Sequence, residues 1–79
     1  MTNYIATFYT HFSALKTCRQ LSQHGVTAHM APVPRKLSAS CGTCVFYQAE
    51  TDLREWMDED VEAIYRCMDT SYQCILWHN

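Results

Sequence analysis

The residues with the most evident chemistry lie at positions 32–44, where Cys41 and Cys44 stand at Cys-x-x-Cys spacing. A cysteine reacts as its thiolate, and the thiol pKa falls beside cations, backbone N–H groups or a second thiol of such a motif. Arg35 supplies a cation, and Gly42 lets the backbone approach a bound anion closely. We therefore predict that Cys41 is a reactive thiol within a loop that activates it.

Three other polar side chains of the same segment fit this interpretation. Lys36 is a second cation, and Ser38 and Ser40 are hydroxyl donors for an anion. The prolines at 32 and 34 prevent a regular strand or helix from continuing, so residues 32–41 are expected to form a loop.

Composition indicates a single folded domain spanning residues 1–79. Nearly half of the residues are apolar, and the chain is too short for a second core. The net charge is −2, with the acidity concentrated at residues 50–62, which argues against nucleic-acid binding because that needs a basic face. No apolar run approaches the roughly 20 residues that cross a membrane, so no membrane association is expected.

The five cysteines do not resemble a disulfide framework. Their count is odd, their spacing is uneven, and no basic-then-apolar leader precedes them. These features favour reduced thiols in a cytoplasmic protein.

Hydrophobic patterning predicts alternating strands and helices. The expected elements are a strand at 3–9, a helix at 10–24 ended by Gly25, strands at 26–31 and 44–48, a helix at 52–68, and a strand at 72–78. This order predicts an α+β, ferredoxin-like βαββαβ sandwich, with two helices on one face of a four-stranded antiparallel sheet.

Both helices are predicted from apolar residues that recur three or four positions apart. In the first helix these residues are Phe12, Leu15, Cys18 and Leu21. In the second they are Leu53, Trp56, Met57, Val61, Ile64, Tyr65 and Met68, with Asp58, Glu59, Glu62, Arg66 and Asp69 off the stripe.

The predicted topology places the loop before Cys41 at the same end of the sheet as the start of the first helix. Thr10 and His11 should therefore approach Cys41, with His11 as a proton donor or thiolate partner. Free N–H groups at the helix start favour an anion by about 0.3–1 kcal/mol.

The run Pro-x-Pro-Arg-x-Leu-Ser-x-Ser-Cys-Gly at residues 32–42 resembles the signature of small bacterial selenium/sulfur carrier-like proteins. The pairs Thr7-Phe8 and Ala14-Leu15, the turn at Gly25 and an acidic second helix are similar to that family as well. The specific part of the resemblance is the segment 32–42.

The resemblance implies a carrier rather than a self-sufficient enzyme, with no cofactor. Cys41 would hold sulfur or selenium as a persulfide or selenosulfide, received from a donor such as a cysteine desulfurase and passed to an acceptor protein. Arg35, the Gly42 amide, Ser38 and Ser40 would stabilise the anion. Neither the choice between sulfur and selenium nor the oligomeric state follows from the sequence.

Cys44 departs from the family pattern and leaves alternatives open. It could attack a Cys41 persulfide and form a disulfide, or it could simply pack in the core. A dithiol redox protein and a non-catalytic interaction module are therefore alternative functions. A zinc site would need Cys67, Cys74 or a histidine to complete it, and because one Cys-x-x-Cys is only half of the usual pattern, no metal site is predicted.

Overall fold

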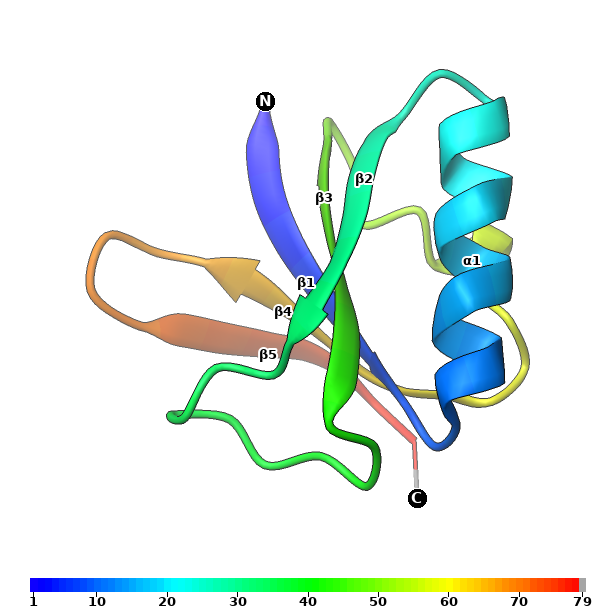
Figure 1. Cartoon of the computed structure of the whole chain (residues 1–79). Coiled ribbons are helices and arrows are strands. Elements are labelled where there is room, and N and C mark those ends of the chain that lie inside the picture. Colours follow the sequence, from blue (N-terminus) through cyan, green and yellow to red (C-terminus); the bar gives the residue numbers. More distant parts are fainter. Residues whose placement is uncertain (79) are drawn as a thin grey trace.

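The computed structural model describes residues 1–78 and shows an α+β fold with one α-helix and one five-stranded antiparallel sheet (Figure 1). The elements are β1 (Thr2–Phe8), α1 (His11–Gln23), β2 (Thr27–Pro32), β3 (Thr43–Ala49), the 3-10 helix η1 (Arg54–Trp56), β4 (Val61–Cys67) and β5 (Tyr72–Trp77). The strand order across the sheet is β2-β3-β1-β4-β5. The α+β class is thus confirmed, whereas the ferredoxin-like arrangement with two helices is not.

The predicted first half of the chain agrees closely with the structure. The Thr10 hydroxyl caps α1 by accepting a hydrogen bond from the Ser13 backbone N–H at 3.1 Å. Gly25 ends the helix with a φ of +80°, a conformation that glycine adopts without steric cost. The strands expected at 3–9, 26–31 and 44–48 correspond to β1, β2 and β3.

The helix predicted at residues 52–68 is wrong, because η1 and β4 occupy that segment. Strand β4 pairs with β1 on one side and with β5 on the other, so its backbone hydrogen bonds go to the sheet. A β-bulge interrupts the β1–β4 pairing, since Thr7 lies opposite Ala63 and Phe8 lies opposite Val61. The bulge puts Val61 and Ile64, three positions apart, into the same core, and this imitates helical spacing.

The main core lies between α1 and the sheet, which the helix covers on one face (Figure 1). Its buried members are Tyr4, Ala6, Phe8, Ala14, Leu21, Val45, Tyr47, Ala49, Val61 and Ile64. Leu53, Trp56 and Met57 pack against this core from the η1 segment. That short segment therefore contributes apolar contacts where a second helix was expected.

The buried stripe of α1 differs from the predicted one. Phe12 is 65% exposed, whereas Ser13, Ala14, Thr17 and Leu21 are buried. The two hydroxyl-bearing residues are buried because they bind the segment that leads into β4. The Thr17 hydroxyl accepts a hydrogen bond from the backbone N–H of Asp58 at 3.1 Å, and the Ser13 hydroxyl donates to the carboxylate of Asp60 at 3.3 Å.

The burial of Leu21 and the exposure of Phe12 predict that substitutions at these two positions lower the free energy of unfolding by different amounts. Leu21→Ala should lower the free energy of unfolding by about 2–5 kcal/mol, because it removes a fully buried side chain and leaves a cavity. Phe12→Ala should change it by less than about 1 kcal/mol, since the Phe12 side chain is largely exposed and its ring contacts the Lys16 ammonium, which lies 4.9 Å from the ring centroid. Chemical denaturation of both variants tests this, and equal losses would contradict the assignment of Phe12 to the surface.

Candidate functional site

The predicted loop is present and carries Cys41 between β2 and β3; we call residues 33–42 the Cys41 loop (Figure 1). A hydrogen bond from the Val33 N–H to the Gly42 carbonyl, at 3.0 Å, closes its neck. Within it, the Leu37 N–H donates to the Pro34 carbonyl at 2.9 Å and forms a turn. The Cys41 side chain is partly buried, so it is neither a core residue nor a fully solvated one.

A buried carboxylate on β4 anchors the loop beside Cys41. The Ser40 backbone N–H donates to Glu62 Oε1 at 3.0 Å, and the Ser40 hydroxyl donates to Glu62 Oε2 at 2.8 Å. The Ser40 hydroxyl, which was predicted to donate to an anion at Cys41, is therefore engaged with Glu62, and so is the Ser40 backbone N–H. Cys41 lies between Ser40, which is hydrogen-bonded to Glu62 on β4, and Gly42, whose carbonyl accepts the hydrogen bond at the loop neck.

Sequence reasoning missed Glu62 because it placed this residue on the solvent face of a helix. In the structure Glu62 is the additional residue of the β4 bulge, between Val61 and Ala63. Bulges re-aim side chains, and this one directs the carboxylate toward the Cys41 loop. The available signal was a single acidic residue within the apolar run Val-Glu-Ala-Ile.

The start of α1 lies close to the residue that follows the Cys41 loop. His11 Nδ1 lies 3.3 Å from the Thr43 hydroxyl oxygen, which places the imidazole near the residue that follows Gly42. Either the imidazole or the hydroxyl can donate in this contact, depending on the tautomer. The predicted action of His11 on the Cys41 thiol remains a prediction.

The other basic and hydroxyl side chains of the loop, those of Arg35, Lys36 and Ser38, are not seen to contact Cys41. Lys36 donates from Nζ to the Thr70 carbonyl at 3.1 Å, and so connects the loop to the turn between β4 and β5. Arg35 and Ser38 are exposed. Their predicted role in stabilising an anion on Cys41 remains a prediction.

Cys44 differs from Cys41 in its surroundings, although only two residues separate them. Its side chain is fully buried on β3, and its thiol donates to the Pro32 carbonyl, with 3.8 Å between sulfur and oxygen. Burial raises the pKa of the Cys44 thiol to about 11, with a smaller contribution from Cys67. The structure thus places Cys44 in the environment expected of a packing residue.

The other cysteines lie on regular elements rather than in the loop. Cys18 packs against the core from α1, Cys74 is exposed on β5, and Cys67 is partly buried at the end of β4, where burial raises its pKa. Within residues 1–78 no group of three or more His, Cys, Asp or Glu side chains could hold a metal ion. No helix in this part of the chain is long and apolar enough to cross a membrane.

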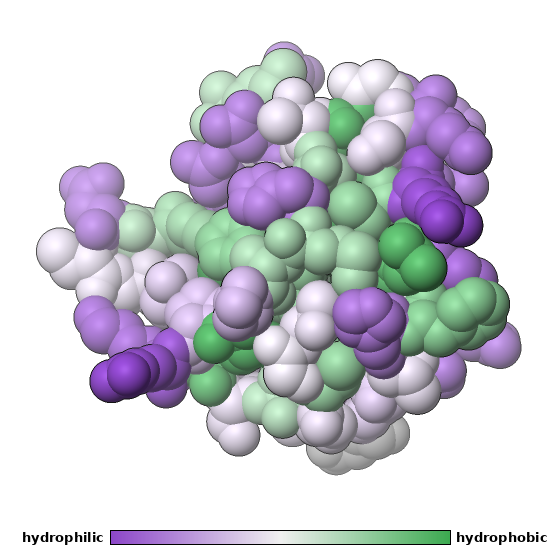
Figure 2. Space-filling view, viewed as in Figure 1, coloured by the Kyte–Doolittle hydropathy of each residue, from purple (hydrophilic) through white to green (hydrophobic). Residues whose placement is uncertain are grey.

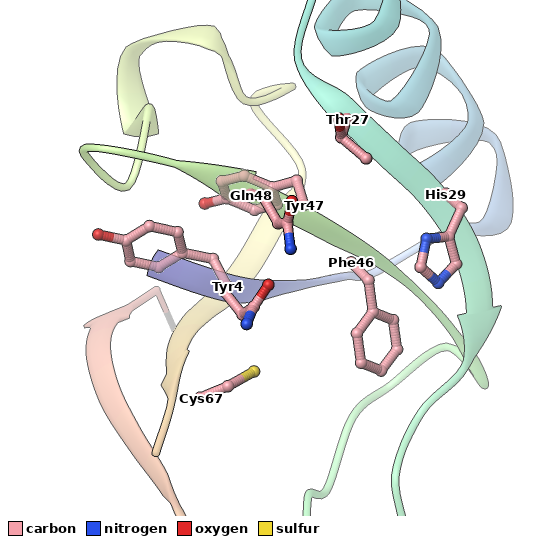
Figure 3. Close-up of a pocket in the computed structure, with 8 residues that line it drawn as sticks. Tyr4, Thr27, His29, Phe46, Tyr47, Gln48 and Cys67 are labelled. Atoms are coloured by element: carbon pink, nitrogen blue, oxygen red, sulfur yellow. The ribbon is translucent and has the colours of Figure 1, made fainter. Parts of the chain in front are cut away.

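A hollow of about 340 Å³ lies beside the sheet, with Asn3, Tyr4, Thr27, His29, Phe46, Tyr47, Gln48 and Cys67 around it (Figure 3). The His29 and Phe46 rings stack in it, with their centroids 5.3 Å apart. Figure 2 shows that apolar residues gather in the middle of the face it views, with hydrophilic residues around the rim. The residues that line the hollow do not include Cys41.

Comparison with protein families gives one match. The family described as "Putative Se/S carrier protein-like" matches residues 3–66, a segment that contains the Cys41 loop and all of β4 except its last residue, Glu62 included. Searches of curated proteins and of solved structures found no match. The matched segment covers most of the chain, and the chain therefore belongs to the Se/S carrier protein-like family.

Proposed function

We propose that this protein is a thiol-based carrier of sulfur or selenium, with Cys41 as the attachment point. Membership of the family supports a carrier in general terms. The observation that supports Cys41 in particular is its position between Ser40, which is bound to Glu62, and Gly42, which is bound to Val33. A partly buried thiol on a doubly anchored loop can be presented to another protein without a large rearrangement.

The proposed transfer is an exchange between sulfur atoms. The Cys41 thiolate attacks the outer sulfur of a donor's cysteine persulfide, such as that of a cysteine desulfurase, and a new sulfur–sulfur bond forms on Cys41. The donor's own sulfur–sulfur bond breaks, and its cysteine leaves as a thiolate. An acceptor protein's nucleophile then attacks the outer sulfur, and Cys41 is released as a thiolate. With selenium as the outer atom, the same steps pass through a selenosulfide.

Charge on Cys41 needs stabilisation from the surrounding loop. We assign this role to the Arg35 guanidinium, the Gly42 amide and the Ser38 hydroxyl, with His11 and the N-terminal end of α1 nearby. Because thiols must stay reduced for this chemistry, we place the protein in the cytoplasm.

The dithiol alternative is less well supported, because it needs Cys44 as a nucleophile. A resolving thiol must reach the loaded sulfur and attack it as the thiolate. Cys44 is buried, and a pKa of about 11 keeps it neutral near pH 7. We therefore propose that Cys44 packs in the core rather than resolving a persulfide.

Loading with a chalcogen should depend on Cys41 alone. After incubation with a cysteine desulfurase and cysteine or selenocysteine, the wild type should gain one sulfur or selenium atom by intact mass spectrometry. Cys41→Ser should gain none, because it lacks the attacking thiolate. Cys74→Ser is the matched control, since it removes an exposed thiol from an edge strand and should load like the wild type.

Two results would overturn the carrier proposal. A wild type that gains no chalcogen would refute it directly. Loss of two hydrogens that requires both Cys41 and Cys44 would establish dithiol redox chemistry in its place.

The two thiols of the Cys-x-x-Cys motif should differ in alkylation. At pH 8 a pKa of about 11 leaves roughly one Cys44 side chain in a thousand as the thiolate, and burial also blocks the reagent. Iodoacetamide should therefore modify Cys41 well before Cys44 in the native protein, and Cys44 should react faster as the pH rises toward 11. Peptide mass spectrometry over a time course measures both rates, with denatured protein as the control; similar native rates would contradict the burial of Cys44.

A further inference from the structure

We propose that Glu62 is a positioning residue for Cys41: its carboxylate holds Ser40, and thereby fixes the loop in the conformation that exchanges the chalcogen. This inference rests on the proposed carrier function and extends it to a residue on β4. Glu62 acts through Ser40 rather than by contact with the transferred atom.

The burial of Glu62 is the first argument. Its side chain is 6% exposed, and it is the only charged residue among the buried positions of residues 1–78. A buried carboxylate is costly unless hydrogen-bond donors compensate for the lost water. Here both donors come from one residue, Ser40, through its backbone N–H and its hydroxyl. The hydrogen bonds of the Glu62 carboxylate therefore join β4 to the Cys41 loop.

The position of the bound residue is the second argument. The N–H of Ser40 belongs to the backbone that leads directly into Cys41, so holding it restricts the adjacent peptide units. On the other side of Cys41, the Gly42 carbonyl accepts the hydrogen bond from Val33. Loss of the Glu62 contacts would remove the hydrogen bonds of the residue directly before Cys41, and the loop neck would remain on the other side of Cys41.

The rigidity of the support is the third argument. Glu62 lies in the β4 bulge, and its own carbonyl accepts a hydrogen bond from the His78 N–H at 2.8 Å. Functional groups are placed more accurately by regular elements than by loops. A side chain anchored in the sheet can therefore impose its geometry on an exposed loop.

The test compares Glu62→Gln with Glu59→Gln, an exposed carboxylate that undergoes the same change of charge. Glutamine keeps the size of Glu62 but offers one oxygen acceptor instead of two charged ones. In Glu62→Gln the initial rate of chalcogen loading should fall by roughly tenfold or more, and hydrogen exchange of the Ser40 amide should accelerate by a similar factor. Glu59→Gln should match the wild type in both measurements.

Two further variants separate positioning from general stability. Ser40→Thr keeps the N–H and the hydroxyl and should retain loading, whereas Ser40→Ala should lose part of it. Adding Ser40→Ala to Glu62→Gln should lower the rate by less than the product of the two single effects, because both remove the same contact. Alkylation of the buried Cys44 should stay slow in every variant. Slow alkylation would show that the substitutions leave the surroundings of β3 intact.

Unchanged loading in Glu62→Gln would overturn the inference, and so would independent, multiplicative effects of the two substitutions. Faster alkylation of Cys44 in Glu62→Gln would also overturn it, because the carboxylate would then act on the whole fold. If the wild type takes up no chalcogen, the carrier function fails, while exchange of the Ser40 amide still reports whether Glu62 holds the loop.

Discussion

The β-bulge between β1 and β4 is the constraint on which both the core and the site depend. Without the additional residue, strict alternation would send Val61 and Ile64 to opposite faces of the sheet. With it, both pack on the side covered by α1, and Glu62 is directed toward the Cys41 loop. Because β1 lies between β3 and β4, the same strand joins the strand that follows the loop to the strand that carries the anchor. The distortion is therefore part of how the sheet presents Cys41.

Polar contacts of α1 and the edge strand β5 support the fold in the part of the chain where a second helix was expected. Backbone and side-chain groups of residues 58–60 bind the hydroxyls of α1, and Lys16 pairs with Asp58 at 2.9 Å. The hydrogen bond from Lys16 lowers the pKa of Asp58, but an ion pair whose lysine is exposed to solvent adds little to stability. Strand β5 forms one edge of the sheet. Its unpaired residue Ile75 forms a second bulge, and its carbonyl accepts a hydrogen bond from Arg54 at 3.4 Å. An irregular edge discourages pairing with a further strand.

Local signals predicted the first half of the fold and the loop, but they failed where the long-range pairing decides the structure. Thr10, Gly25 and the two prolines act on their immediate neighbours, so their effects could be inferred from sequence. Residues 52–68 have apolar spacing that fits a helix, and only the pairing of β4 with two other strands shows that half of that segment belongs to the sheet. The same error hid Glu62. A residue assigned to a solvated helix face could not be matched with Ser40, which is 22 positions away along the chain.

The contrast between Cys41 and Cys44 bears on what a carrier must avoid. On the proposed function, an accessible second thiolate close to Cys41 would attack the loaded sulfur, release it as sulfide and leave a disulfide. The Cys-x-x-Cys spacing brings a second thiol close to Cys41 along the chain, as that reaction requires. The strand prevents it by two effects that act together, since burial blocks access to Cys44 and also raises the pKa of its thiol to about 11. Cys44 lies in a strand that pairs with β1 on one side and with β2 on the other, whereas Cys41 lies in the loop that precedes this strand. The boundary between loop and strand therefore gives two neighbouring thiols different surroundings, as the proposed carrier function requires: a partly buried Cys41 in the loop and a fully buried Cys44 in the strand.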